Sequence, residues 1–269
     1  MHDRLWLFLA TLGYLTSAGW GLYALGSKRP VANRWTFLLI AAAFTLHTVF
    51  LYQRGQAIQH CPITNLFETL AFFSWSLALT YLVVGPTYRM SILGAFTATV
   101  VFLINFFARA APIDLPGAMP HLGWQLELHA TLALMGLGVL GIAAMAGVAY
   151  LIQERQLKRH VLNAWFYTLP NVGRLEMVQQ QVLVWGFTIF SAGAFLGFFI
   201  PHHGPDDWVK IAWSGVVWCL YAALVAVLAL GRLSHKKTAL ISVAGYVFIL
   251  LTFWGINSLS EAHVFPHEG

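Results

Sequence analysis

Histidine is the residue type in this chain best suited to chemistry, because a neutral imidazole can ligate haem iron, zinc or copper. Among its 11 histidines, His47, His129 and His263 are the candidate ligands. His47 lies inside an apolar run, where an ionisable group is costly unless it faces a partner or a cavity. An ordinary role competes at each position: a hydrogen bond to a neighbouring helix for His47, an interfacial site for His129, and a solvated tail for His263. The residues alone leave both interpretations open.

The stretch from Pro201 to Trp218 is the second candidate. It combines three indoles with a polar cluster, namely Trp208, Trp213, Trp218, His202, His203, Asp206 and Asp207. A five-residue spacing turns about 140° per step on a helix, so the indoles form no continuous stripe. This predicts a loop or surface-lying segment that runs into a membrane helix. The paired histidines have no H-x-H or HExxH spacing, so we expect a solvated loop rather than a metal site.

The elements that must position these residues are long apolar runs. Only 9% of residues are charged, the mean hydropathy is +0.70, and runs of about 20 apolar residues recur, as a bilayer requires. The alternating pattern of outer-membrane strands is missing. We therefore predict an all-α fold: a polytopic membrane helical bundle that forms a single integral membrane domain over residues 1–269. The eight predicted spans are 5–26, 36–53, 66–85, 90–108, 125–153, 181–200, 211–231 and 238–257.

The basic residues predict the orientation of these spans. Eleven of the 15 lysines and arginines fall in the loops 27–35, 86–89, 154–180 and 232–237. Because basic loops stay on the cytoplasmic side, both termini are predicted to lie outside, on the periplasmic side of a bacterial-type inner membrane. His60, His129, the loop at 201–210 and His263 then share the outer side. The aromatic inner segment 163–170 predicts an interfacial helix.

Several function classes are disfavoured by composition and motifs. Basic membrane loops account for the net charge of +5, so no nucleic-acid partner is expected. Cys61 and Cys219 fall at different predicted depths and form no CxxC motif, which argues against disulfide, redox or covalent haem chemistry on this chain's own thiols. The chain shows no nucleophile or acid–base pair of its own, so a lyase reaction would require a partner.

Four blocks of sequence, in order over about 45–265, resemble CcsA-type cytochrome c assembly proteins. The first block is His47-Thr-Val-Phe-Leu-Tyr-Gln-Arg54 followed by His60-Cys-Pro-Ile-Thr-Asn-Leu-Phe-Glu-Thr-Leu-Ala-Phe-Phe-Ser-Trp75. The second is Leu128-His129 leading to Gly147-Val-Ala-Tyr-Leu-Ile-Gln-Glu-Arg-Gln-Leu-Lys158. The third and fourth are Trp213-Ser-Gly-Val-Val-Trp-Cys-Leu-Tyr221 and Gly255-Ile-Asn-Ser-Leu…His263. The tryptophan-rich core of the family's loop and its second membrane histidine, near Ala226, are absent, so the chain looks closer to the HemX- or YpjD-like branch.

The resemblance implies haem handling at the outer face. His129 and His263 match the external histidines that ligate haem iron, and His47 matches the first membrane histidine, a second or transit ligand. The cofactor would be non-covalent haem b. An aromatic platform at the interface suits a flat apolar macrocycle. Trp208 and Trp213 would form this platform, and Arg54 or Lys210 would pair with the propionates.

The implied function is haem handling or delivery in cytochrome c biogenesis. Its partners would be membrane lipid and a membrane protein of the assembly system, with apocytochrome c a further candidate. A haem-free regulatory or scaffold protein of the HemX type is one alternative. The other is a small-molecule transporter that uses the polar positions His47, Asn65, Glu68 and Asn105.

Overall fold

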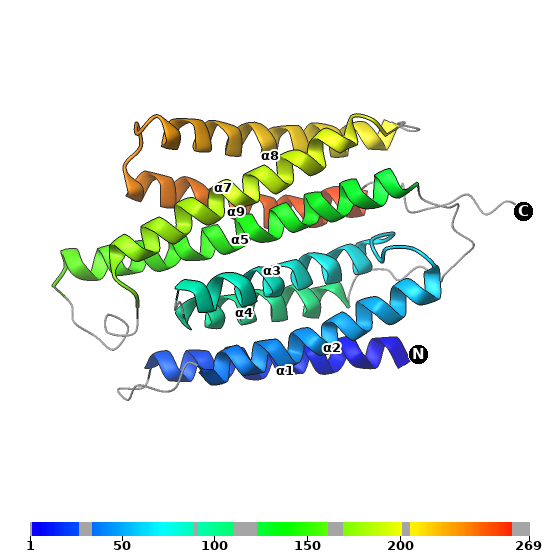
Figure 1. The fold of residues 1–269 in the computed structure, drawn as a ribbon, viewed down its shortest axis with the longest axis horizontal. Helices are drawn as coiled ribbons and strands as arrows, with labels where there is room; N and C mark the ends of the chain where they lie inside the picture. The colour runs from blue at the N-terminus through cyan, green and yellow to red at the C-terminus, as the bar shows by residue number, and fades with distance from the viewer. Residues whose placement is uncertain are drawn as a thin grey trace, which may run out of the picture.

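The computed structural model describes residues 2–26, 34–88, 91–109, 123–160, 169–200 and 205–259, and their regular structure is entirely helical. Eight helices follow one another along the chain (Figure 1). They are α1 (His2–Gly26), α2 (Arg34–Ile58), α3 (Leu66–Tyr88), α4 (Ser91–Ala108), α5 (Trp124–Lys158), α7 (Val172–Gly197), α8 (Pro205–Ala229) and α9 (His235–Leu259). The predicted all-α class is thereby confirmed.

The helices are long and apolar enough for a multi-pass membrane protein. Within the described residues, seven can cross a bilayer by length and hydropathy, and Leu93–Ala108 of α4 is a shorter apolar helix. Several helices extend beyond the predicted spans: α2 ends at Ile58 rather than 53, and α7 begins at Val172 rather than 181. The predictions followed only the apolar stretches, whereas a helix continues through polar turns outside the hydrocarbon.

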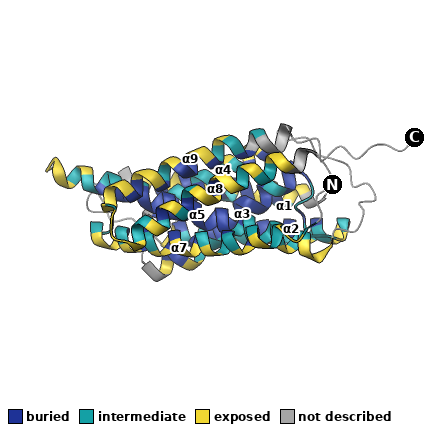
Figure 2. Ribbon diagram, turned by 90° about the horizontal axis from the view of Figure 1, so that it is seen from above, coloured by how far each residue is buried: buried dark blue, intermediate teal, exposed yellow. Residues whose placement is uncertain are grey.

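Two helical groups pack side by side along α3 and α5 (Figure 1). Helices α1 to α4 contact one another in the first group, and α5 packs against α7 and α9 in the second. Viewed from above, buried residues line the middle of the bundle along α3 and α5 (Figure 2). Glycines allow α5 and α7 to approach closely: a Cβ added to Gly136 would lie 2.5 Å from the backbone nitrogen of Phe190. Small residues at membrane helix interfaces commonly serve this purpose.

One end of the bundle gathers the segments that carry the candidate residues. The start of α1, the α2–α3 connection, the start of α5, the end of α7 and the end of α9 all lie there (Figure 1). We call it the His129 end. Arg155 and Lys158 lie at the opposite end, with the α8–α9 connection. The shared end is a property of the structure, whereas its placement outside the membrane stays a prediction.

Some predicted features fall outside the described residues. His263 follows the end of α9, and His202 and His203 precede α8; none of the three is among the residues described. Most of the predicted interfacial helix at 163–170 also lies outside them.

Candidate functional site

His129 is held in a defined orientation between α5 and α7. Its Nδ1 lies 2.7 Å from the carbonyl oxygen of Gly193. Because a carbonyl only accepts hydrogen bonds, Nδ1 carries the proton and Nε2 presents its lone pair. No described residue makes a hydrogen bond to Nε2. A backbone carbonyl on one nitrogen is the usual way to prepare the other for metal ligation.

The ring of His129 also rests against the backbone of α7. A Cβ added to Gly197 would lie 2.7 Å from Cε1 and 2.9 Å from Nδ1 of His129. Gly193 and Gly197 therefore form a seat for the imidazole: one supplies the acceptor and the other leaves room for the ring. This seat was not predicted from the sequence, although the i, i+4 spacing of two glycines at the end of a helix signals such a close approach.

Trp208 and Trp213 have different environments. Trp208 lies in the first turn of α8 and is 65% exposed. Trp213 is half-buried: its Nε1–H donates to Thr252 Oγ1 at 2.8 Å, and its ring centroid lies 5.8 Å from that of Phe253. The segment before the predicted span 211–231 is helical rather than a loop, because α8 already begins at Pro205. Proline suits the first turn of a helix, where its missing N–H costs no hydrogen bond.

His47 lies in the other helical group, enclosed by aromatic rings. It is fully buried in α2, with ring centroids 6.0 Å from Tyr14 and 6.2 Å from Phe50. The Ala71 backbone lies close by, but neither ring nitrogen has a well-directed hydrogen bond within the described part of the chain. The ring is eleven residues from the end of α2, about 16 Å at 1.5 Å per residue.

Arg54 is engaged in a buried ion pair. Its Nε lies 2.6 Å from Oε1 of Glu68, and the two side chains are 8% and 0% exposed. The other carboxylate oxygen accepts from the backbone N–H and the hydroxyl of Thr64, at 3.0 and 2.6 Å. Asn65 Oδ1 accepts from the backbone N–H of Glu68, which caps the start of α3. The arrangement fastens the end of α2 to the start of α3.

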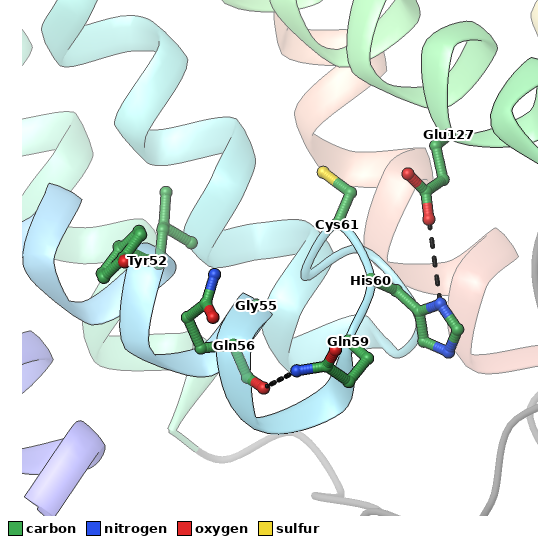
Figure 3. Close-up of a pocket in the computed structure, with 8 residues that line it drawn as sticks. Tyr52, Gly55, Gln56, Gln59, His60, Cys61 and Glu127 are labelled. Carbon is green, nitrogen blue, oxygen red and sulfur yellow. Dashed lines mark hydrogen bonds and ion pairs between the residues drawn. The ribbon is translucent and has the colours of Figure 1, made fainter.

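A pocket that the sequence did not predict lies beside this connection (Figure 3). Its volume is about 360 Å³, and His60, Cys61 and Glu127 line one side. The Nδ1 of His60 is 3.8 Å from Oε1 of Glu127, while Cys61 Sγ lies 3.7 Å from Thr131 Oγ1. Burial raises the pKa of the Cys61 thiol, Thr131 opposes the shift, and the carboxylates of Glu127 and Glu68 add to it. Glu127 and Thr131 lie one helical turn apart on a face of α5 different from that of His129.

The described residues thus define a class: a polytopic helical membrane protein with an oriented imidazole near one end of the bundle. The family model for the cytochrome c assembly protein matches residues 63–263. The chain belongs to this family, which supports a role in cytochrome c biogenesis. The match includes His129, Trp208 and Trp213 and ends at His263, whereas His47 and Arg54 precede it.

Curated relatives extend the likeness over most of the chain. It is 23% identical to "Protein HemX" of Bacillus subtilis (strain 168), with 87% of each chain covered. It is 26% identical to "Cytochrome c biogenesis protein CcsA" of Synechococcus sp. (strain CC9902), over 94% of this chain and 91% of the relative. The protein of the same name from Guillardia theta is 21% identical, over 82% and 81%. The expected resemblance to the CcsA and HemX proteins is confirmed.

The family is haem-related, and the residues at the His129 end fit such a group. The proton on Nδ1 is committed to Gly193, which leaves Nε2 with the lone pair that an iron ligand needs. The exposed indole of Trp208 provides aromatic surface at the same end of the bundle.

Proposed function

We propose that the chain binds haem b non-covalently at the His129 end and handles it there during cytochrome c biogenesis. The observation that carries the proposal is the hydrogen bond from His129 Nδ1 to Gly193, which leaves Nε2 as the available nitrogen. When bound, haem supplies an iron that accepts axial imidazoles and can change its oxidation state.

The proposed ligand pair is His129 and His263. His263 lies four residues beyond Leu259, where α9 ends at the His129 end of the bundle, so the intervening chain is short. Trp208 would cover one face of the macrocycle, and Trp213 would support it from the α8–α9 interface. Lys210, two residues after Trp208, and Arg54 are the proposed partners for the propionates; the guanidinium of Arg54 is paired with Glu68. A propionate contact of Arg54 would need that buried pair to open.

His47 is proposed as a second or transit ligand, on the condition that its neighbouring side chains move. Its ring is fully buried beside Tyr14 and Phe50, so haem could reach it only if these side chains moved. His47 would then act at a separate step from His129.

The remaining parts of the proposal concern location and partners. We place the chain in a bacterial-type inner membrane with both termini outside, because eleven of its 15 basic residues fall in the opposite set of loops. A partner membrane protein of the assembly system and contact with apocytochrome c are further parts of the proposal, which membership of the cytochrome c assembly family supports.

Absorption spectra of the protein purified in mild detergent, oxidised and reduced, test haem binding. We expect a low-spin Soret band and α-band in the wild type, and their loss or a shift to high spin in His129→Ala and in His263→Ala. His160→Asn is the matched control at the opposite end; asparagine tolerates the positive φ of 53° at that position. Wild type that stays without haem after loading would favour the haem-free scaffold instead, and haem that survives both alanine changes would show that His129 and His263 are not its ligands.

A further inference from the structure

The pocket of Figure 3 has an apolar side and a polar side. Leu51 and the largely exposed Tyr52 line it where α2 is still apolar. One turn further along α2 the exposed Gln56 lines it, followed by the exposed Gln59 just past the end of the helix, and Glu127 and His60 complete the polar side. A pocket of about 360 Å³ lies within the range for small-molecule sites. The polarity across it suits an amphipathic ligand.

The charge of the polar side is negative. Glu127 is the only carboxylate of the described lining, and no lysine or arginine lines the pocket in that part of the chain. The nearest cation in sequence, Arg54, has its Nε on Glu68. The Glu127 side chain is 30% exposed, and its carboxylate lies 3.8 Å from His60 Nδ1, within ion-pair distance but beyond hydrogen-bond distance (Figure 3). This carboxylate can therefore accept a hydrogen bond from a cationic group in the pocket.

The position of the pocket along α2 favours a lipid as the source of that cation. Leu51 and Tyr52 belong to a helix that is long and apolar enough to span a membrane, and Gln56 and Gln59 mark its polar end. Tyrosine at such a boundary is typical of headgroup depth. A ligand here would have its cationic group outside the hydrocarbon and its chains along α2.

We propose that this pocket binds a phospholipid with a primary ammonium headgroup. The ammonium would donate to Glu127, and the amide of Gln56 would donate to the phosphodiester. Leu51 and Tyr52 would contact the first part of an acyl chain. The site lies on a face of α5 different from that of His129, so it is independent of haem binding.

Native mass spectrometry of the full chain in detergent at pH 8, with phosphatidylethanolamine, phosphatidylcholine or phosphatidylglycerol added, tests the proposal. We expect wild type to retain phosphatidylethanolamine at least tenfold more tightly than either other lipid, since the trimethylated headgroup has no N–H to donate and the glycerol headgroup has no cation. Glu127→Gln should abolish this preference with little change in volume. Glu154→Gln is the matched control: it lies on the same helix at the opposite end, with its carboxylate 2.6 Å from Lys158.

Two further measurements keep the test decisive. If Glu127→Gln fails to fold, soluble glycerophosphoethanolamine should displace the lipid from wild type, whereas glycerophosphoglycerol should not. Equal retention of all three lipids, an unchanged preference in Glu127→Gln, or displacement only by a lysine-containing peptide would overturn the proposal. The haem spectrum of Glu127→Gln should match that of wild type, so failure of this site and failure of haem binding are separate results.

Discussion

The Nε of Arg54 lies 2.6 Å from Oε1 of Glu68, and both side chains are shielded from solvent. Thr64 satisfies the second carboxylate oxygen through its backbone N–H and its hydroxyl. The pair therefore has the extra hydrogen bonds that a buried ion pair needs to offset its desolvation. It fixes the connection that carries His60 and Cys61.

Removing one partner of this pair should destabilise the protein strongly. Glu68→Gln and Arg54→Leu each leave a buried group without its counter-charge, at a cost of roughly 3–5 kcal/mol. The double change, Arg54→Leu with Glu68→Leu, should cost less than the sum of the two single changes, because no uncompensated charge remains. Thermal unfolding in detergent measures all three. Lys158→Ala, at the solvent-exposed end of the pair with Glu154, is the control, and its effect should be much smaller because water screens this pair. Equal losses at the two pairs would contradict the expected cost of burial.

Gly197→Ala should disturb His129 without replacing any proposed ligand residue. The added methyl would lie 2.7 Å from Cε1 of His129, so the ring must turn and lose its hydrogen bond to Gly193. Nitrogen NMR of labelled histidine in the haem-free protein should show a loss of the Nδ1–H tautomer. Haem affinity should fall at least tenfold, with a shift to high spin. Gly215→Ala, on α8, serves as the control because its added Cβ has no atom within 4 Å. An unaltered His129 tautomer in Gly197→Ala would show that Gly197 is not needed to hold the ring in this orientation.

The amino-acid sequence predicted the helices well because the bilayer imposes a strong, local signal. A run of apolar residues without charges has few alternatives to a membrane helix, so each predicted span coincides with a helix of the described structure. Helix ends were predicted less well. The end of α2 and the start of α7 are polar turns, and hydropathy does not register them.

The candidate site was predicted only as a set of residue types. The spacing of His129 could not indicate that Gly193, 64 residues later, accepts its proton, because that contact depends on how α5 and α7 pack. The same limit applies to Asn65 and Glu68, which the transporter interpretation treats as substrate-binding polar groups. In the structure they cap α3 and pair with Arg54. The pocket at Glu127 combines two segments distant in sequence, so no local pattern signals it.

Trp213→Phe should weaken the contact between α8 and α9. The change removes the Nε1–H that donates to Thr252 at 2.8 Å but keeps an aromatic ring against Phe253. We expect a loss of about 1 kcal/mol in unfolding free energy, the usual net value of one hydrogen bond. In a double-mutant cycle, Trp213→Phe should add little once Thr252→Val is present. Full additivity of the two changes would show that the hydrogen bond contributes nothing.

The Cys61 thiol should react slowly at neutral pH. Burial is the main cause that raises its pKa; the hydrogen bond to Thr131 opposes the shift, and the charges of Glu127 and Glu68 add to it. Only the thiolate is the nucleophile, so alkylation should rise at a pH above the ordinary thiol range near about 8.5. The alkylation rate of a Cys219→Ser variant, followed from pH 6 to pH 10 with a water-soluble maleimide, gives the titration of Cys61 alone.

Glu127→Gln in the Cys219→Ser background tests whether the charge of Glu127 raises the pKa of Cys61. Loss of one nearby negative charge favours the thiolate, so the alkylation curve should move to lower pH, while the contribution of burial remains.

Because the folded protein prefers the neutral thiol of Cys61, the stability of the protein should fall as pH rises through the range between the unfolded and the folded pKa of Cys61. Unfolding measured at pH 7 and pH 10 in Cys219→Ser, with the further change Cys61→Ser as control, should show this loss only when Cys61 is present. An alkylation curve of Cys61 with its midpoint at the ordinary thiol pKa, unchanged by Glu127→Gln, would mean that Cys61 is exposed to solvent and does not lie beside Thr131.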